Sequence, residues 1–134
     1  MEALINIDVP ELETAIEFYQ RAAGLTLSRR LFDGTVAELS GASVRIFLLQ
    51  KDKGSSPVPE MSLVRDYRRH WTPVHFDLVV SNIEVAIEMA VAAGASLEGD
   101  IHSYVWGHQA CLCDPFGNGF CFVQWLGDGY SEVP

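Results

Sequence analysis

An internal repeat constrains this chain more than any other feature of its sequence. Five identities recur in the same order 71 positions apart: Glu13, Ala15, Ile16, Glu17 and Ala22 in the first copy, Glu84, Ala86, Ile87, Glu88 and Ala93 in the second. Each copy then ends in Ala-Gly, at Gly24 and Gly94. Helices of similar composition can imitate such a match. The strand patterns around them also repeat, and this favours a duplicated module.

Alternating and helical hydrophobic patterns predict the same order of elements in both halves. The first half gives a strand at 4–9, a helix at 11–23 and strands at 25–32, 36–39 and 43–50. The second half gives a strand at 75–80, a helix at 83–93 and strands at 96–104, 108–113 and 120–125. A glycine directly after each helix suits a left-handed C-cap. Each half therefore reads as a βαβββ module.

A polar stretch rich in Gly, Ser and Pro separates the two patterns. Such a composition is typical of a connection without regular structure. We therefore predict a single domain over 1–134. Its parts are module one at about 1–50, a linker at 51–73, module two at 74–127 and a tail at 128–134.

Composition narrows the classes of partner and the compartment. The chain has 134 residues, 49% of them hydrophobic, and a formal net charge of −9. Binding to a nucleic-acid backbone needs a basic face, so we expect no nucleic-acid partner. The chain starts without an export signal and has no apolar run long enough for a membrane span, so we expect a cytoplasmic protein with no membrane partner.

The cysteines predict neither a disulfide framework nor a structural zinc site. There are three, Cys111, Cys113 and Cys121, and none forms a CxxC pair. Cys111 and Cys113 are two apart on one strand face. We interpret both as buried, unreactive thiols.

Three motifs resemble the vicinal oxygen chelate superfamily. They are Ile16-Glu17-Phe18-Tyr19, then Ala23-Gly24-Leu25, and a closing Asp114-Pro115-Phe116-Gly117-Asn118-Gly119-Phe120. Members include glyoxalase I, extradiol dioxygenases, fosfomycin-modifying enzymes and metal-free bleomycin resistance proteins. The resemblance implies an α+β glyoxalase-like fold, in which two tandem βαβββ modules form a cup-shaped pair of half-barrels from mixed sheets, with helices outside. It also implies a homodimer. The Asp114 motif itself reads as a turn with a structural role.

The resemblance also implies a metal held by the first and last strands of each module. Aligning the two modules on the starts of their first strands and helices, and on Gly41 and Gly117 before their last strands, puts these positions at Leu4, Arg45, His75 and Cys121. Leucine cannot donate, arginine repels a cation, and a catalytic zinc needs about three protein ligands. We therefore expect no cofactor and no metal ligands, and keep a divalent metal as the alternative.

Strand periodicity puts His75 and Asp77 on one face, as it does Leu4 and Asp8. The predicted ligand-binding residues are Asp8, Arg45, His75, Asp77, Trp106, His108 and Cys121. His75 is also the candidate catalytic acid or base. The competing interpretations are a hydrogen-bonded strand histidine for His75, an ion pair with Asp8 or Asp77 for Arg45, and a structural role for His108.

Two functions remain open on the sequence. In the first, the chain resembles bleomycin resistance proteins and binds a small organic molecule, with an anionic one suggested by Arg45, after loss of the usual metal site. In the second, it is a metal-dependent glyoxalase-like lyase or isomerase, or a dioxygenase, that uses His75 with non-standard partners. The sequence leaves open whether the chain is an enzyme at all.

Overall fold

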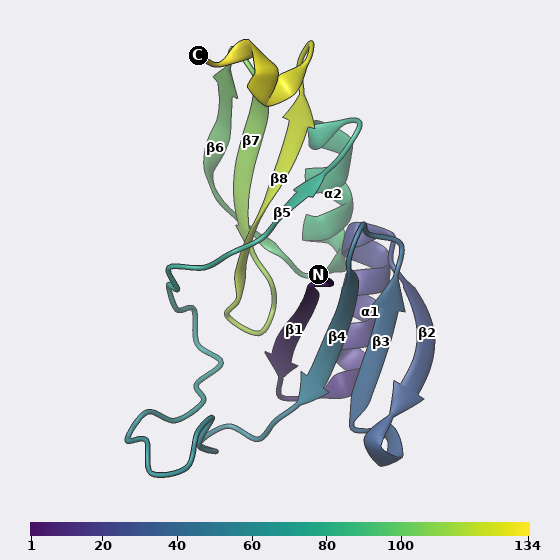
Figure 1. The fold of residues 1–134 in the computed structure, drawn as a ribbon, viewed down its shortest axis with the longest axis vertical. Coiled ribbons are helices and arrows are strands. Elements are labelled where there is room, and N and C mark those ends of the chain that lie inside the picture. The colour runs from purple at the N-terminus through teal and green to yellow at the C-terminus, as the bar shows by residue number, and fades with distance from the viewer. The chain divides into compact units, whose positions relative to one another are not determined.

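Both halves of the chain fold into the βαβββ unit that the repeat predicts. The computed structural model describes residues 1–134 and divides them into two units, Met1–Arg68 and Arg69–Pro134 (Figure 1). The first contains β1 (Leu4–Val9), α1 (Leu12–Ala23), β2 (Thr26–Leu31), η1 (Phe32–Gly34), β3 (Val36–Ser40) and β4 (Arg45–Gln50). The second contains β5 (Asp77–Val79), α2 (Ile83–Ala93), β6 (Ser96–Tyr104), β7 (Gly107–Cys113), β8 (Gly119–Trp125) and η2 (Gly129–Glu132). The predicted α+β class is confirmed.

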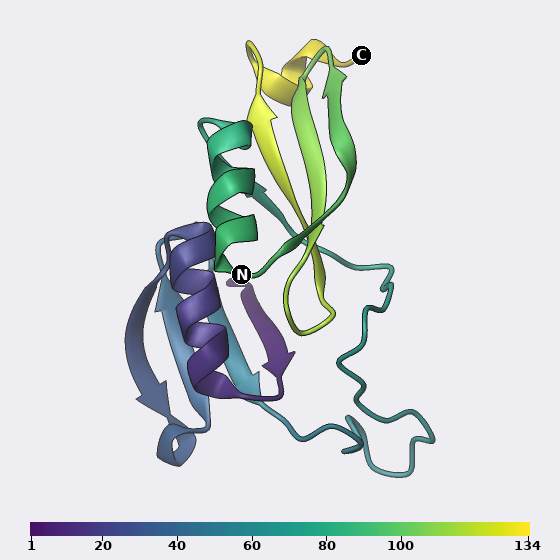
Figure 2. The same cartoon turned by 180° about the vertical axis from the view of Figure 1, so that it is seen from behind.

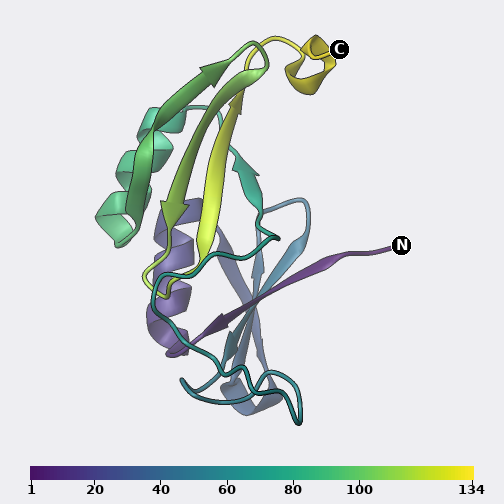
Figure 3. The same ribbon diagram turned by 90° about the vertical axis from the view of Figure 1, so that its left-hand side faces the viewer.

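The two sheets share one topology. The first has the strand order β1-β4-β3-β2 and the second β5-β8-β7-β6. In each, the first and last strands of the module pair in parallel, and the other neighbours are antiparallel. Each unit is therefore an open mixed sheet with one helix, and Figures 2 and 3 show that helix lying against a single face of its sheet.

Caps fix the ends of both helices. The Glu11 carboxylate accepts hydrogen bonds from the N–H groups of Glu13 and Thr14, and the Asn82 side chain accepts one from Val85. At the other end, Gly24 and Gly94 have positive φ angles of 66° and 119°. A side chain is strained in that region, so glycine ends both helices, as the repeat predicts.

A glutamine in the last strand of each module also binds the start of that module's helix. The Gln50 Oε1 atom accepts a hydrogen bond from the Leu12 N–H at 3.1 Å, and the Gln124 Oε1 atom accepts one from the Ile83 N–H at 2.8 Å. These contacts fix the helix-facing side of each sheet. The core of each unit lies there, and it includes Leu12, Leu48, Leu112 and Phe122, all at most 2% exposed.

The segment between the modules has no helix or strand. Its first part belongs to the first unit, because the Arg65 guanidinium pairs with Asp8 at 2.7 Å and the Tyr67 hydroxyl donates to the Lys51 carbonyl. The predicted strand 75–80 is shorter in the structure, at Asp77–Val79, although Phe76 and Val80 still make backbone hydrogen bonds to β8. Neither helix has the length and apolar character needed to cross a lipid bilayer.

Candidate functional site

A row of chemically reactive side chains crosses the second sheet. The strand registers place Asp77 opposite Cys121, Cys121 opposite Cys111, and Cys111 opposite Glu98. Directly opposed residues of a sheet present their side chains on the same face. Gln124, which binds α2, is an odd number of residues from Cys121 and lies on the other face. The row therefore occupies the face that α2 does not cover.

A cavity of about 210 Å³ opens beside this row. It combines apolar walls with ionisable groups, as ligand pockets commonly do. Its lining residues are Arg69, Trp71, Thr72, His75, Glu98, Cys111, Leu112, Gly119, Phe120 and Cys121. All of them belong to the second unit.

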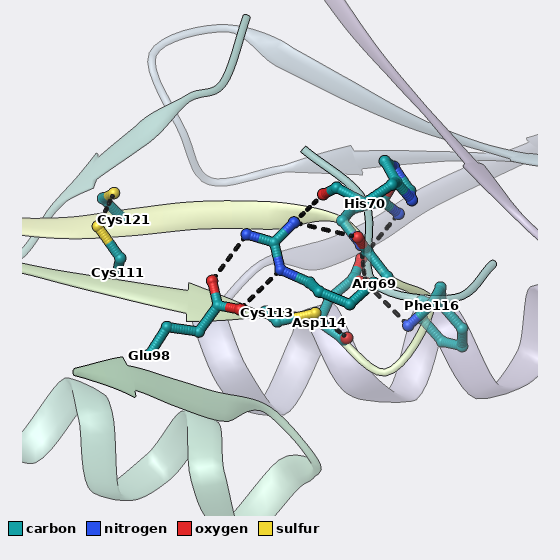
Figure 4. Close-up of polar contacts among 10 residues, drawn as sticks. Arg69, His70, Glu98, Cys111, Cys113, Asp114, Phe116 and Cys121 are labelled. Atoms are coloured by element: carbon teal, nitrogen blue, oxygen red, sulfur yellow. Dashed lines mark hydrogen bonds and ion pairs between the residues drawn. The ribbon is translucent and has the colours of Figure 1, made fainter. Parts of the chain in front are cut away.

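An ion pair forms one wall of the cavity. The Arg69 guanidinium binds both carboxylate oxygens of Glu98, each at 2.7 Å, and also donates to the carbonyl of His70 (Figure 4). Hydrogen bonds from Arg69 lower the pKa of the Glu98 carboxyl, and those same bonds raise the pKa of Arg69. The two groups are therefore charged together near neutral pH and largely neutralise each other.

Three possible metal ligands converge at the other end of the row. The His75 Nε2 atom lies 3.3 Å from the Asp77 Oδ1 atom. The ligand atoms of His75, Asp77 and Cys121 all lie within 4.8 Å of one another. Ligand atoms around a tetrahedral zinc ion are separated by roughly 3.3–3.8 Å. The three side chains would need only small movements to hold one ion.

The first module does not complete the metal site that the superfamily resemblance implies. Since Gln50 and Gln124 make the same contact, they align the modules 74 positions apart on their last strands. The counterpart of Cys121 is therefore Phe47, and the alignment that gave Arg45 is wrong by two residues. The side chains of Leu4 and Phe47 donate nothing to a metal, so the four-ligand arrangement does not fit this chain.

The two predicted site residues of the first module are both in ion pairs. The Asp8 carboxylate pairs with the Arg65 guanidinium at 2.7 Å. Arg45 pairs with Glu2 at 2.5 Å and lies 3.7 Å from Glu38, in place of the expected partners Asp8 or Asp77. Hydrogen bonding to Glu2 raises the pKa of Arg45. The guanidinium therefore stays charged and paired with Glu2.

Two predicted residues of the second module lie away from the cavity. Trp106 stacks on Tyr104 with ring centres 4.9 Å apart and also contacts Trp125 and Tyr130, in an aromatic cluster near the end of β8. His108 is opposite Gln124, on the face that α2 covers, and its Nδ1 atom is 2.8 Å from the Ser103 hydroxyl. The structure brings together only His75, Asp77 and Cys121 of the predicted set.

Three ionisable residues of the cavity, Arg69, Glu98 and Cys111, escaped prediction as site residues. Arg69 falls in the predicted linker, and Glu98 has the pattern of an exposed strand residue. The prediction that Cys111 is buried is wrong, because its side chain is exposed. Cys113 is buried, as predicted, and its thiol donates to the Asp114 carbonyl. The only available signal was spacing across the turn that begins at Asp114. If Cys113 and Gly119 are opposed at the ends of the two strands, then Cys111 and Cys121 are the next residues opposed on the same face.

The stability of the fold should depend on pH through Cys121. Burial, followed by contact with Cys111, raises the pKa of the Cys121 thiol above its usual value. The folded chain keeps this proton where the unfolded chain, with a thiol pKa near ~8.5, releases it. The contribution to stability is thus complete below about pH 8.5 and is lost as the pH rises toward the folded-state pKa.

We expect the free energy of unfolding to fall above about pH 8.5, by up to ~1.4 kcal/mol per pH unit for this thiol. Urea unfolding under reducing conditions at pH 7.5, 8.5 and 9.5 measures the slope. The slope should be smaller in Cys121→Ser. Equal slopes in the two proteins would contradict the assignment.

Comparison with known proteins is consistent with this geometry. A family model described as a glyoxalase-like domain matches residues 4–123. No curated protein sequence matches the chain. A glyoxalase/bleomycin resistance protein/dioxygenase family enzyme from Burkholderia phytofirmans PsJN has a similar structure, with a TM-score of 0.73, 18% identity, and coverage of 92% of this chain and 97% of that one.

Two further solved structures share the fold. The fosfomycin resistance protein FosX from Listeria monocytogenes has a TM-score of 0.70 and 15% identity, over 94% of this chain and 93% of that one. TnmS3, an antibiotic binding protein from Streptomyces sp. CB03234, has a TM-score of 0.65 and 20% identity, over 94% and 96%. At these identities the likeness shows the fold alone. The family match covers most of the chain, which therefore belongs to the glyoxalase-like domain family, within the vicinal oxygen chelate superfamily that its turn motif indicates.

Proposed function

We propose that this protein binds a small organic molecule in the cavity of its second module, without the metal that is usual in its superfamily. The cavity itself carries the proposal, because it joins His75 and Cys121 to the large apolar ring of Trp71. The side chain of Trp71 is 80% exposed, so its ring is free to cover a bound molecule. The antibiotic-binding role of TnmS3 supports ligand binding as a use of this fold.

The charges around the cavity favour a neutral ligand over an anionic one. The expectation of an anion rested on Arg45, which is paired with Glu2 and Glu38. Arg69 is likewise engaged by Glu98. We therefore propose a planar, largely apolar molecule with a neutral polar group, which His75 would bind by a hydrogen bond.

A matched pair of probes tests this proposal. We expect 2-naphthamide to shift the backbone NMR signals of His75, Gly119 and Cys121 in a saturable way, and 2-naphthoate to bind more weakly. Loss of one hydrogen bond in His75→Ala should weaken 2-naphthamide binding by up to about tenfold, whereas the exposed control His102→Ala should not. Shifts that avoid the cavity, or equal losses in both variants, would refute the proposal.

The convergence of His75, Asp77 and Cys121 favours a second candidate, a metal-dependent lyase, isomerase or dioxygenase. A bound divalent ion would supply Lewis-acid chemistry. In that case His75, Asp77 and Cys121 would hold the ion and leave a position open for substrate oxygen. The purified protein should then contain zinc, nickel, manganese or iron in near-stoichiometric amount, and a chelator should lower its thermal stability. That result would replace the metal-free proposal.

We also propose a cytoplasmic location and a homodimer. Three free cysteines, one of them exposed, suit a reducing compartment. The superfamily resemblance supports dimerisation, and large exposed apolar side chains such as Leu63, Val74 and Val79 would gain from burial. Light scattering coupled to size exclusion should give the mass of two chains. The mass of one chain at micromolar concentration would contradict the homodimer.

A further inference from the structure

Cys111 and Cys121 form a close pair on neighbouring strands. They are directly opposed in the antiparallel ladder of β7 and β8, and their Sγ atoms are 3.1 Å apart (Figure 4). The Cys121 N–H donates to the Phe76 carbonyl on the β5 side. The N–H and C=O of one strand residue point to the same side, so Cys121 makes no ladder hydrogen bond to Cys111.

The absence of that hydrogen bond determines the type of cross-strand pair. Opposed residues without mutual ladder hydrogen bonds have Cα atoms about 4.5 Å apart, and their side chains approach closely. A disulfide needs a Cα separation of roughly 4.4–6.8 Å. The two strands can therefore accept a bridge between these residues with little backbone movement.

The two thiols differ in access. Both cysteines line the cavity, but Cys111 is exposed whereas Cys121 is only 5% exposed. A small oxidant can therefore reach Cys111 directly. The Cys121 sulfur lies next to the Cys111 sulfur and is in position to react with it once Cys111 has been oxidised. Cys113 is buried and its thiol donates to a backbone carbonyl, so it provides a matched unreactive cysteine.

We propose that Cys111 and Cys121 are a reversible thiol–disulfide pair in the wall of the cavity, oxidised by hydroperoxides. The Cys111 sulfur attacks the terminal peroxide oxygen, the O–O bond breaks, and an alcohol or water leaves as Cys111 becomes a sulfenic acid. The Cys121 sulfur then attacks the Cys111 sulfur, the S–S bond forms, and the hydroxyl leaves as water with the Cys121 proton. Two thiols are oxidised by two electrons and one peroxide is reduced.

The bridge would change the cavity. It would withdraw both thiols as hydrogen-bond donors and would remove Cys121 as a possible metal ligand beside His75 and Asp77. A ligand bound by the reduced protein would then be released on oxidation, a consequence that rests on the proposed function. Formation of the bridge itself does not depend on any ligand.

Thiol counting on the full chain tests the pair. The reduced protein has three alkylatable cysteines after unfolding. One equivalent of hydrogen peroxide should leave one, with the intact mass lower by two hydrogen atoms before alkylation, and dithiothreitol should restore three. No lysine or arginine follows Arg69, so cleavage before Asp114, not tryptic digestion, separates the two halves of the bridge.

Single cysteine variants identify which two residues form the bridge. Cys113→Ser should form the disulfide as wild type does, and Cys111→Ser should not. The exposed position of Cys111 makes loss of folding in that variant unexpected, and circular dichroism checks it. The proposal is overturned if wild type keeps three thiols, if Cys111→Ser still forms an intramolecular bridge through Cys113, or if the bridge joins two chains.

Binding of 2-naphthamide to reduced and oxidised protein separates this inference from the proposed function. A disulfide without probe binding to either form would sink the ligand proposal and leave the pair standing. Probe binding to a protein that forms no disulfide would do the reverse. The ligand-binding proposal and the thiol–disulfide pair are both supported if the bridge forms and weakens binding of 2-naphthamide.

Discussion

Replacing Asp114 by alanine should destabilise the fold by about 3 kcal/mol, through loss of hydrogen bonds to buried backbone donors. The Asp114 carboxylate is 3% exposed and accepts hydrogen bonds from the N–H groups of Phe116 and Asn118 at 2.8 and 2.9 Å. It also accepts one from the Asn118 side-chain amide at 3.0 Å. Alanine leaves these donors without that acceptor, and the Phe116 N–H is buried.

Urea unfolding measures the loss directly, and a thermal scan should show a melting temperature lower by about 10 °C. The matched control is Asp128→Ala, an exposed aspartate of the same unit, which should change stability by less than about 0.5 kcal/mol. Asp114→Asn keeps an acceptor oxygen for the two N–H groups and should fall between the two. An Asp114→Ala protein as stable as Asp128→Ala would show that the turn does not need its carboxylate.

The same turn matters for the candidate site. It joins β7 to β8 and sets the register that puts Cys111 opposite Cys121. A less well-ordered turn would move the two thiols apart and would disturb the part of the cavity that they line. Asp114→Ala should therefore also slow formation of the proposed disulfide.

The sequence predicted the architecture well because local signals determine most of it. Alternating apolar residues place Ile7 and Val9 on the buried face of β1, and Gly24 and Gly94 end the helices where a positive φ is required. The turn at Asp114 was also readable, since aspartate accepts the N–H groups of the residues that follow it. Each of these features depends on only a few neighbouring residues.

The candidate site was harder to predict because it depends on contacts across strands. Period-2 alternation put His75 and Asp77 on one face, yet it does not reveal that Glu98 and Cys111 continue the same row. That needs the register of three strand pairs. Arg69 reaches the site from a segment without regular structure, where no periodicity exists to read.

The misaligned Arg45 has a specific cause. The modules were aligned on Gly41 and Gly117, which lie in connections of different form. Gly41 lies four residues before the start of β4, whereas Gly117 lies two residues before the start of β8, so matching the glycines shifts the strands by two residues. Because the error was two residues, it kept the correct face and changed only the position along the strand.

Two glycines of the second sheet should respond very differently to alanine. At Gly107, an added Cβ would lie 2.3 Å from the Gln124 carbonyl oxygen and 3.3 Å from the Trp125 Cα atom. Backbone atoms of a paired strand cannot move aside without breaking the ladder. Overpacking of this kind should cost about 3 kcal/mol in Gly107→Ala, measured by urea unfolding.

At Gly119, the same addition would lie 2.8 Å from an Arg69 guanidinium nitrogen, the end of a flexible side chain. Arg69 can swing away, and the pair it would lose with Glu98 is partly exposed, at 39% and 35% for the two side chains. Alanine also suits a strand better than glycine by roughly 0.5–1 kcal/mol, which offsets that loss. Gly119→Ala should therefore leave stability within about 0.5 kcal/mol of wild type.

The effect of Gly119→Ala should appear in the cavity instead. Departure of Arg69 removes the hydrogen bonds that lower the pKa of Glu98, so that pKa should rise toward the ordinary carboxyl range. Carboxyl NMR titration of Glu98 measures this shift, with Glu84 as an internal reference. An unchanged Glu98 pKa would contradict the prediction, and so would a loss of stability as large as in Gly107→Ala. Either result would mean that contacts other than the ion pair with Glu98 hold Arg69 in place.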